Sequence, residues 1–128
     1  MPWFRIRVRR RRVRKASAKS RAEFQQLKSA ALALVTLRLQ HFNRHYNLTY
    51  NKLFIRNTRS RWGSCSSRHN LGFNYRVAKL PPALADYVVV HELCHIKEFN
   101  HSKAFWALVA ETIPDWRVRR NRLRGIRF

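Results

Sequence analysis

The sequence lacks features that would place it in several large classes of protein. No apolar run approaches the roughly 18 residues that a membrane-spanning helix needs, so we expect no association with a membrane. The opening residues, Met1-Pro2-Trp3-Phe4-Arg5, lead into arginines instead of an apolar stretch, so we expect no secretory signal. Only two cysteines are present, Cys65 and Cys94, which argues against a disulfide framework and favours a cytoplasmic protein with reduced thiols.

Acidic residues are also scarce, and their placement is uneven. The chain has 28 Lys and Arg but only 6 Asp and Glu, so its formal net charge is +22. Such a surface attracts polyanions, above all nucleic acid. Residues 1–20 carry nine basic side chains and residues 117–128 carry six arginines, with no acid in either stretch. Five of the six acids lie between residues 86 and 115, where we therefore expect the chemistry.

The hydrophobic pattern of the first half predicts one strand, one long helix and a hairpin. Alternating apolar residues over 4–9 predict a strand, and Ser20 with Glu23 forms a capping box that predicts the start of a helix. We expect the helix to bury an apolar stripe made of Phe24, Leu27, Ala31, Leu34, Val35, Leu39 and Phe42. Strands are predicted over 48–57 and 71–78, with a turn after Gly63 that joins them as a hairpin.

The second half is predicted to be helical. Helices are expected over about 83–99, from the capping residue Ser102 to about 113, and from 116 onward. With 128 residues and 45% hydrophobic composition the chain fits one folded domain. We assign residues 1–20 to a basic arginine-rich segment and residues 21–128 to an α+β domain.

The segment His91-Glu92-Leu93-Cys94-His95 matches H-E-x-x-H on a predicted helix. Residues four apart lie on one helix face, so both imidazoles can reach one metal ion. Glu92 is placed to take a proton from a water molecule instead of binding the metal. The alternative is a helix whose two histidines are only solvated or packed, but a buried glutamate between two buried histidines is hard to explain in that way.

A catalytic zinc ion needs a third protein ligand, for which the sequence offers two candidates. His101 follows His95 by six residues, the gap found in H-E-x-x-H-x-x-G-x-x-H enzymes. Glu98 replaces the glycine of that pattern, so the helix must continue further and end at a residue such as Asn100, which tolerates a left-handed turn. Glu111, on the following helix, is the alternative ligand.

Several separated motifs, taken in order, resemble the YgjP-like metallopeptidases, small zincin-type proteins related to the WLM and SprT-like groups. The resemblance covers roughly residues 45–125. It is carried by Arg61-Trp62-Gly63-Ser64-Cys65-Ser66, Leu71-Gly72-Phe73-Asn74-Tyr75-Arg76, the run from Asp86 to His95, Asn100-His101-Ser102 and Phe105-Trp106.

The resemblance implies a zincin-like fold in which a small antiparallel sheet packs on the H-E-x-x-H helix, with flanking helices. It implies one zinc ion held by His91, His95 and His101, with Glu92 as general base, and hydrolysis of peptide or related amide bonds in a peptide or protein substrate. The strand over 71–77 would then be the edge that pairs with an extended peptide. Family members usually carry a longer β-rich segment before the first helix.

Two further functions stay open from the sequence. The arginine-rich termini could bind DNA or RNA without sequence specificity, either beside a peptidase activity or in place of it. A non-enzymatic nucleic-acid-binding protein would carry a structural zinc site, closed by a fourth ligand such as Cys65. Cys94 lies on a different helix face from the two histidines, and we interpret it as a packing residue.

Overall fold

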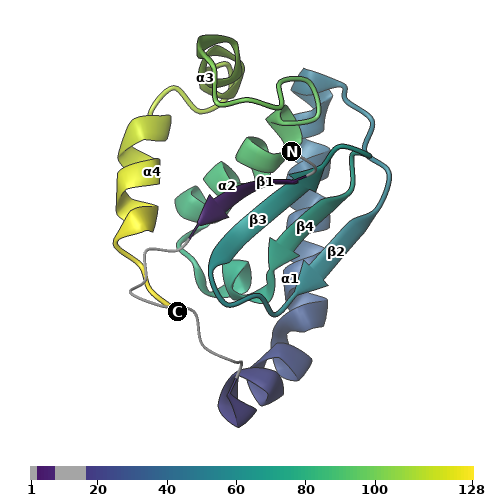
Figure 1. Cartoon of the computed structure of the whole chain (residues 1–128), viewed down its shortest axis with the longest axis vertical. Helices are drawn as coiled ribbons and strands as arrows, with labels where there is room; N and C mark the ends of the chain where they lie inside the picture. The colour runs from purple at the N-terminus through teal and green to yellow at the C-terminus, as the bar shows by residue number, and fades with distance from the viewer. Residues whose placement is uncertain (1–2, 8–16) are drawn as a thin grey trace.

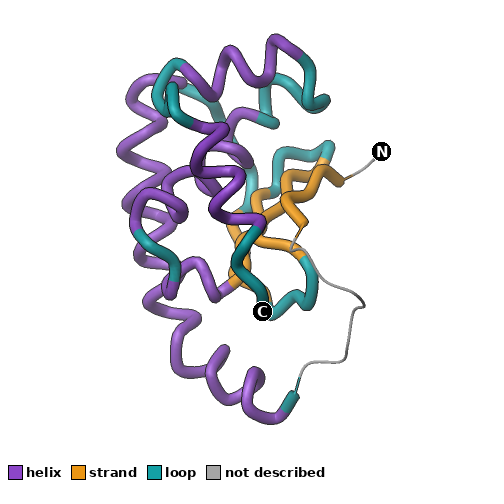
Figure 2. Tube along the Cα trace, turned by 90° about the vertical axis from the view of Figure 1, so that its left-hand side faces the viewer, coloured by secondary structure: helices purple, strands orange, loops and turns teal. Residues whose placement is uncertain are grey.

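A computed structural model describes residues 3–7 and 17–128. Helices and a four-stranded sheet form an α+β fold, as predicted. In Figure 1 the helices α1 and α2 lie behind the sheet, and Figure 2 shows the helical layer on one side of the strands. No helix among the described residues is long and apolar enough to cross a membrane.

The helix α1, Ala18–Tyr46, begins earlier than predicted. Its N-cap is Ser17, whose hydroxyl accepts a hydrogen bond from the amide of Ser20 at 3.0 Å. The predicted capping box, in which Ser20 would cap the helix, is therefore wrong. Ser17 caps the helix one turn upstream, and the amide of Ser20 is the group that it satisfies. The helix ends at Asn47, which is left-handed with φ of 52°. Its buried residues belong to the predicted stripe: Ala31, Val35, Leu39 and Phe42.

The sheet has the strand order β1-β3-β4-β2 and consists of β1 (Trp3–Arg7), β2 (Leu53–Arg56), β3 (Arg61–Ser66) and β4 (Leu71–Asn74). β3 pairs antiparallel with both β1 and β4, whereas β2 pairs parallel with β4. The predicted hairpin of 48–57 with 71–78 is wrong, and the sheet is mixed instead of antiparallel. The residues of β3 are nearly all buried, so the strand shows no alternation that a sequence pattern could reveal.

β4 is shorter than predicted and lies inside the sheet. It ends at Asn74, whose side-chain oxygen accepts a hydrogen bond from the amide of Arg76 at 3.0 Å and caps a 3₁₀ helix, η1 (Tyr75–Lys79). Because β3 and β2 already occupy both edges of β4, the predicted pairing of a peptide with the strand over 71–77 is wrong. The predicted strand over 4–9 and the predicted basic segment over 1–20 both extend into residues 8–16. Those nine residues lie outside the described residues.

Three helices follow η1: α2 (Pro82–Cys94), α3 (Lys103–Ala110) and α4 (Trp116–Arg124). α2 is buried along most of its length and ends five residues before the predicted limit at 99. Ser102 caps α3 as predicted, accepting from the amide of Phe105 at 3.3 Å. The predicted left-handed turn at Asn100 is wrong, since Asn47 and His69 are the described non-glycine residues with positive φ.

Candidate metal centre

Three histidines from the end of α2 and the loop before α3 converge on one point. α2 carries His91 and is C-capped by His95, and the chain then turns so that His101 comes back over the helix end. The Nε2 atom of His101 lies 3.1 Å from the Nε2 atoms of both His91 and His95. One ligand atom from each histidine lies within 4.8 Å of the others, so the three residues could hold a metal ion.

The three nitrogens fit a zinc ion. Zn–N bonds of about 2.0–2.1 Å in a tetrahedral site separate the nitrogens by roughly 3.3 Å, close to the spacing found. Burial lowers the pKa of His95 to about 4, and burial is also the main cause of the lowered pKa values of His91 and His101. All three imidazoles are therefore neutral at pH 7, the form that binds a metal.

The tautomer of His95 is fixed by a hydrogen bond behind it. Its Nδ1 lies 2.9 Å from the backbone carbonyl oxygen of Glu98. Because a carbonyl only accepts, Nδ1 must carry the proton, and the lone pair of Nε2 faces the other two histidines. Glu98 thus acts on the centre through its backbone, and its side chain takes no part in the histidine cluster.

Aromatic rings hold the imidazoles in place. Phe105 stacks on His95 with ring centroids 4.2 Å apart, and Trp106 stacks on His101 at 5.7 Å. Trp106 is itself stacked on Trp116 at 4.0 Å, which ties the site to α4. The sequence contained these rings in the Phe105-Trp106 motif, but their role as supports needed the tertiary structure.

Glu92 is fully buried beside the histidines. Within the described part of the chain neither of its carboxyl oxygens has a hydrogen-bond partner, and Oε2 lies 3.3 Å from Nδ1 of His91 without hydrogen-bond geometry. Burial raises the pKa of this carboxyl well above its ordinary value. An unpartnered buried carboxyl is costly, so its retention at this place points to a use in chemistry.

Gly63 on β3 makes room for this carboxyl, a role that the sequence analysis missed. A Cβ at this position would lie 2.8 Å from Cγ of Glu92 and 2.9 Å from its Oε2. The available signal was an isolated glycine within a short segment that turned out to be a strand, since such glycines mark a close approach.

The other candidate ligands lie elsewhere. Glu111 caps the end of α3, and its exposed carboxylate contacts Nε2 of His45 at 2.9 Å. Cys65 and Cys94 are both buried free thiols, and neither belongs to the group of potential ligands formed by the three histidines. Among the residues that the structure describes, the cluster is thus made of histidines alone.

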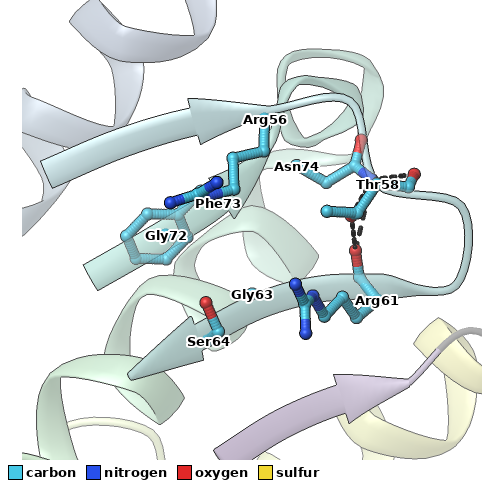
Figure 3. Close-up of a pocket in the computed structure, with 8 residues that line it drawn as sticks. All are labelled: Arg56, Thr58, Arg61, Gly63, Ser64, Gly72, Phe73 and Asn74. Atoms are coloured by element: carbon cyan, nitrogen blue, oxygen red, sulfur yellow. Dashed lines mark hydrogen bonds between the residues drawn. The ribbon is translucent and has the colours of Figure 1, made fainter. Parts of the chain in front are cut away.

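A second feature lies on the sheet. A pocket of about 10 Å³ is lined by residues of β2, β3 and β4 and of the segment between β2 and β3. Figure 3 shows that the side chains of Arg56 and Arg61 point into it. The pocket has room for about one water molecule. It is too small for a substrate.

The family is decided by a match that spans nearly the whole chain. The family model of the YgjP-like metallopeptidase domain matches residues 5–125. The chain belongs to the YgjP-like family. The match begins well before residue 45, where the resemblance of the motifs begins, and so includes α1 and most of β1. It confirms the predicted family and the α+β zincin-like class, and it identifies a metallopeptidase domain, hence a peptidase that uses a metal.

A solved structure has the same fold. The crystal structure of the metallopeptidase zymogen of Pyrococcus abyssi abylysin is similar with a TM-score of 0.58 and 23% sequence identity. The similarity covers 70% of this chain and 87% of that one. A search of curated proteins finds no match. The assignment of individual site residues in this YgjP-like chain therefore rests on its own geometry.

Proposed function

We propose that this chain is a zinc-dependent peptidase in which His91, His95 and His101 hold the ion and Glu92 is the general base. The observation that carries the proposal is the convergence of three neutral imidazoles beside a buried carboxyl without a hydrogen-bond partner, with Nε2 of His101 3.1 Å from Nε2 of both His91 and His95. Zinc bound there would act as a Lewis acid on a water molecule and on the carbonyl of the scissile amide.

Glu92 supplies the proton transfers in this proposal. It takes a proton from the attacking water and delivers it to the nitrogen of the departing amine, so that the amide bond breaks and a carboxylate and an amine form. Burial raises the pKa of Glu92, which makes the carboxylate a stronger base than an exposed glutamate. The approach of Gly63 confines the carboxyl to the side of His91.

The ligand set supports a catalytic ion over a structural one. Structural zinc sites are normally closed by four protein ligands, often cysteines, whereas catalytic sites keep one position open. In the described chain the cluster contains three histidines and no thiol or carboxylate. Cys65 does not suit the role of a fourth ligand, because it is buried in the core and burial raises the pKa of its thiol to about 12.

Metal analysis of matched variants tests the proposal. One zinc per chain is expected after dialysis of the natural protein, of Glu92→Gln and of Glu111→Ala, and a loss of zinc is expected in His101→Ala. Glu92→Gln should abolish hydrolysis of a quenched fluorescent peptide while it retains the metal. Zinc retained in His101→Ala and lost in Glu111→Ala would overturn the ligand assignment, and absence of zinc from the natural protein would overturn the enzyme.

We also infer a non-specific affinity for nucleic acid as a second function. It is supported by α4, which carries five arginines, of which Arg119 alone forms an ion pair with a described acid, Asp115. Duplex DNA should bind at about 50 mM salt, weaken steeply as salt rises and bind equally well to Glu92→Gln. Absence of binding at low salt would refute this second function.

A further inference from the structure

One arginine of α4 differs from its neighbours because it faces the histidine centre. Arg120 is half-buried, and its guanidinium lies over the ring of Trp106, 5.3 Å from the centroid. The same ring contacts His101 and His91, with centroids 5.7 and 5.9 Å away. One indole therefore separates this positive charge from two of the three histidines.

No acid of this chain neutralises Arg120. The chain has six acidic residues, all in the described part, and Glu92 is the buried base. Four others pair with different basic side chains, in the pairs Asp86 with Arg38, Glu111 with His45, Glu23 with Lys79 and Asp115 with Arg119. Glu98 acts through its carbonyl and forms no ion pair with Arg120. A half-buried guanidinium without an internal carboxylate is available to an external one.

We propose that Arg120 binds a carboxylate of the substrate beside the histidine centre, so that the peptidase prefers acidic peptides. This inference rests on the proposed function. The carboxylate is either an Asp or Glu side chain near the scissile bond or the free C-terminus of the peptide. Arg120 is a specificity residue in this scheme, because it contacts a part of the substrate that does not react.

A peptide carboxylate fits this position better than a phosphate of nucleic acid. Arg117 and Arg122 are exposed on α4 and can follow a polyanion along the surface. Arg120 is instead held against Trp106, next to the buried histidines, where a peptide bound at the centre would present its carboxylates.

The test compares Arg120→Ala with Arg117→Ala. Arg117 is a matched control because it lies on the same helix and over a tryptophan ring, that of Trp116, at 5.1 Å. Quenched fluorescent peptides would differ by Asp or Asn, and by Glu or Gln, at each position near the cleaved bond, with free or amidated C-termini. We expect the zinc-loaded natural protein to prefer the carboxylate form by roughly 10- to 100-fold in kcat/KM. Arg120→Ala should lose this preference and Arg117→Ala should keep it.

A binding measurement gives a second readout that needs no turnover. In a Glu92→Gln background, anisotropy of a labelled acidic peptide should show an affinity at least about tenfold above that of its Asn or Gln counterpart. Adding Arg120→Glu should reverse the order toward Lys-containing peptides. Retained zinc content and an unchanged melting temperature show that these variants are folded.

The outcomes separate this inference from the proposed function. Cleavage without any preference for carboxylates, or a preference that survives Arg120→Ala, overturns the role of Arg120 and leaves the peptidase intact. A preference that is lost equally in Arg117→Ala also overturns the role of Arg120, because general charge attraction then explains the data. Equal displacement of the peptide by duplex DNA from Arg120→Ala and Arg117→Ala overturns it for the same reason. Absence of cleavage of every peptide by the zinc-loaded protein overturns the proposed function itself.

Discussion

Replacing Gly63 by alanine tests whether β3 positions Glu92, the proposed general base. The new Cβ would lie 2.8 Å from Cγ of Glu92, about 0.6 Å short of ordinary contact at 3.4 Å. The neighbouring atoms belong to a buried side chain with no solvent to move into, so the carboxyl or the strand must shift by several tenths of an ångström.

The expected effect follows from that displacement. Catalytic groups must be held within about 0.5 Å, and misplacement by about 1 Å costs on the order of 100-fold in rate. We therefore expect Gly63→Ala to lower kcat for peptide hydrolysis about 10- to 100-fold. Overpacking should also lower the free energy of unfolding by about 1–3 kcal/mol. Zinc content should stay at one per chain, because the three atoms nearest to this Cβ all belong to Glu92.

Gly72→Ala is the matched control. Its Cβ would lie 2.8 Å from Oγ of Ser64, an equally close contact that does not involve Glu92. Gly72→Ala should therefore lower the free energy of unfolding by no more than Gly63→Ala does and should keep one zinc per chain, whereas kcat should not change. Combining Gly63→Ala with Glu92→Ala should remove most of the stability loss, since alanine lacks the Cγ, Cδ and Oε2 atoms that the new Cβ would meet.

The assays are kcat from a quenched fluorescent peptide, unfolding by urea followed by circular dichroism, and zinc by mass spectrometry. The reasoning is refuted by a kcat within about threefold of the natural protein in folded, zinc-loaded Gly63→Ala. It is equally refuted by the same fall in kcat in Gly72→Ala, because strain in the sheet would then suffice as the cause.

Three further predictions concern stability and access to the site. The hydrogen bond from Tyr75 lowers the pKa of Glu23, so this carboxylate stabilises the fold above its unfolded pKa of about 4.3 and loses that effect as the pH falls through the lower folded pKa. Glu23→Gln should lower the free energy of unfolding in urea by under about 1 kcal/mol at pH 7, and an equal loss at pH 2 would contradict this cause. The two hydrogen bonds of Arg38 with Asp86 join α1 to α2 at 2.8 and 3.0 Å, so Arg38→Ala should cost about 1–3 kcal/mol and a melting temperature unchanged within error would show the pair to be neutral. β1 pairs with the edge of β3, the strand that approaches Glu92, and would compete with a peptide for that edge. Removing residues 1–16 should therefore raise kcat/KM for peptides several-fold, and an unchanged kcat/KM in a folded, zinc-loaded protein would exclude this competition.

The sequence predicted those features that depend on near neighbours in the chain. Helical spacing places His91 and His95 on one face, and the apolar stripe of α1 follows from the helical repeat. Ser102 caps α3 because a hydroxyl three residues before a free amide satisfies it. The family could be identified from short motifs for the same reason, since each motif is contiguous.

Tertiary structure decided what depends on segments far apart. The order of the strands put β3 between β1 and β4, and burial of both faces of β3 removed the alternation that would have revealed the strand. Because α2 ends at Cys94, His101 can reach the histidine cluster, whereas the carboxylate of Glu111 contacts His45 on α1. The sequence places the candidate ligands and the proposed base in one short region. The close approach of Gly63 and the position of Arg120 arise only when distant elements pack, because contacts of that kind leave no periodic signal in a sequence.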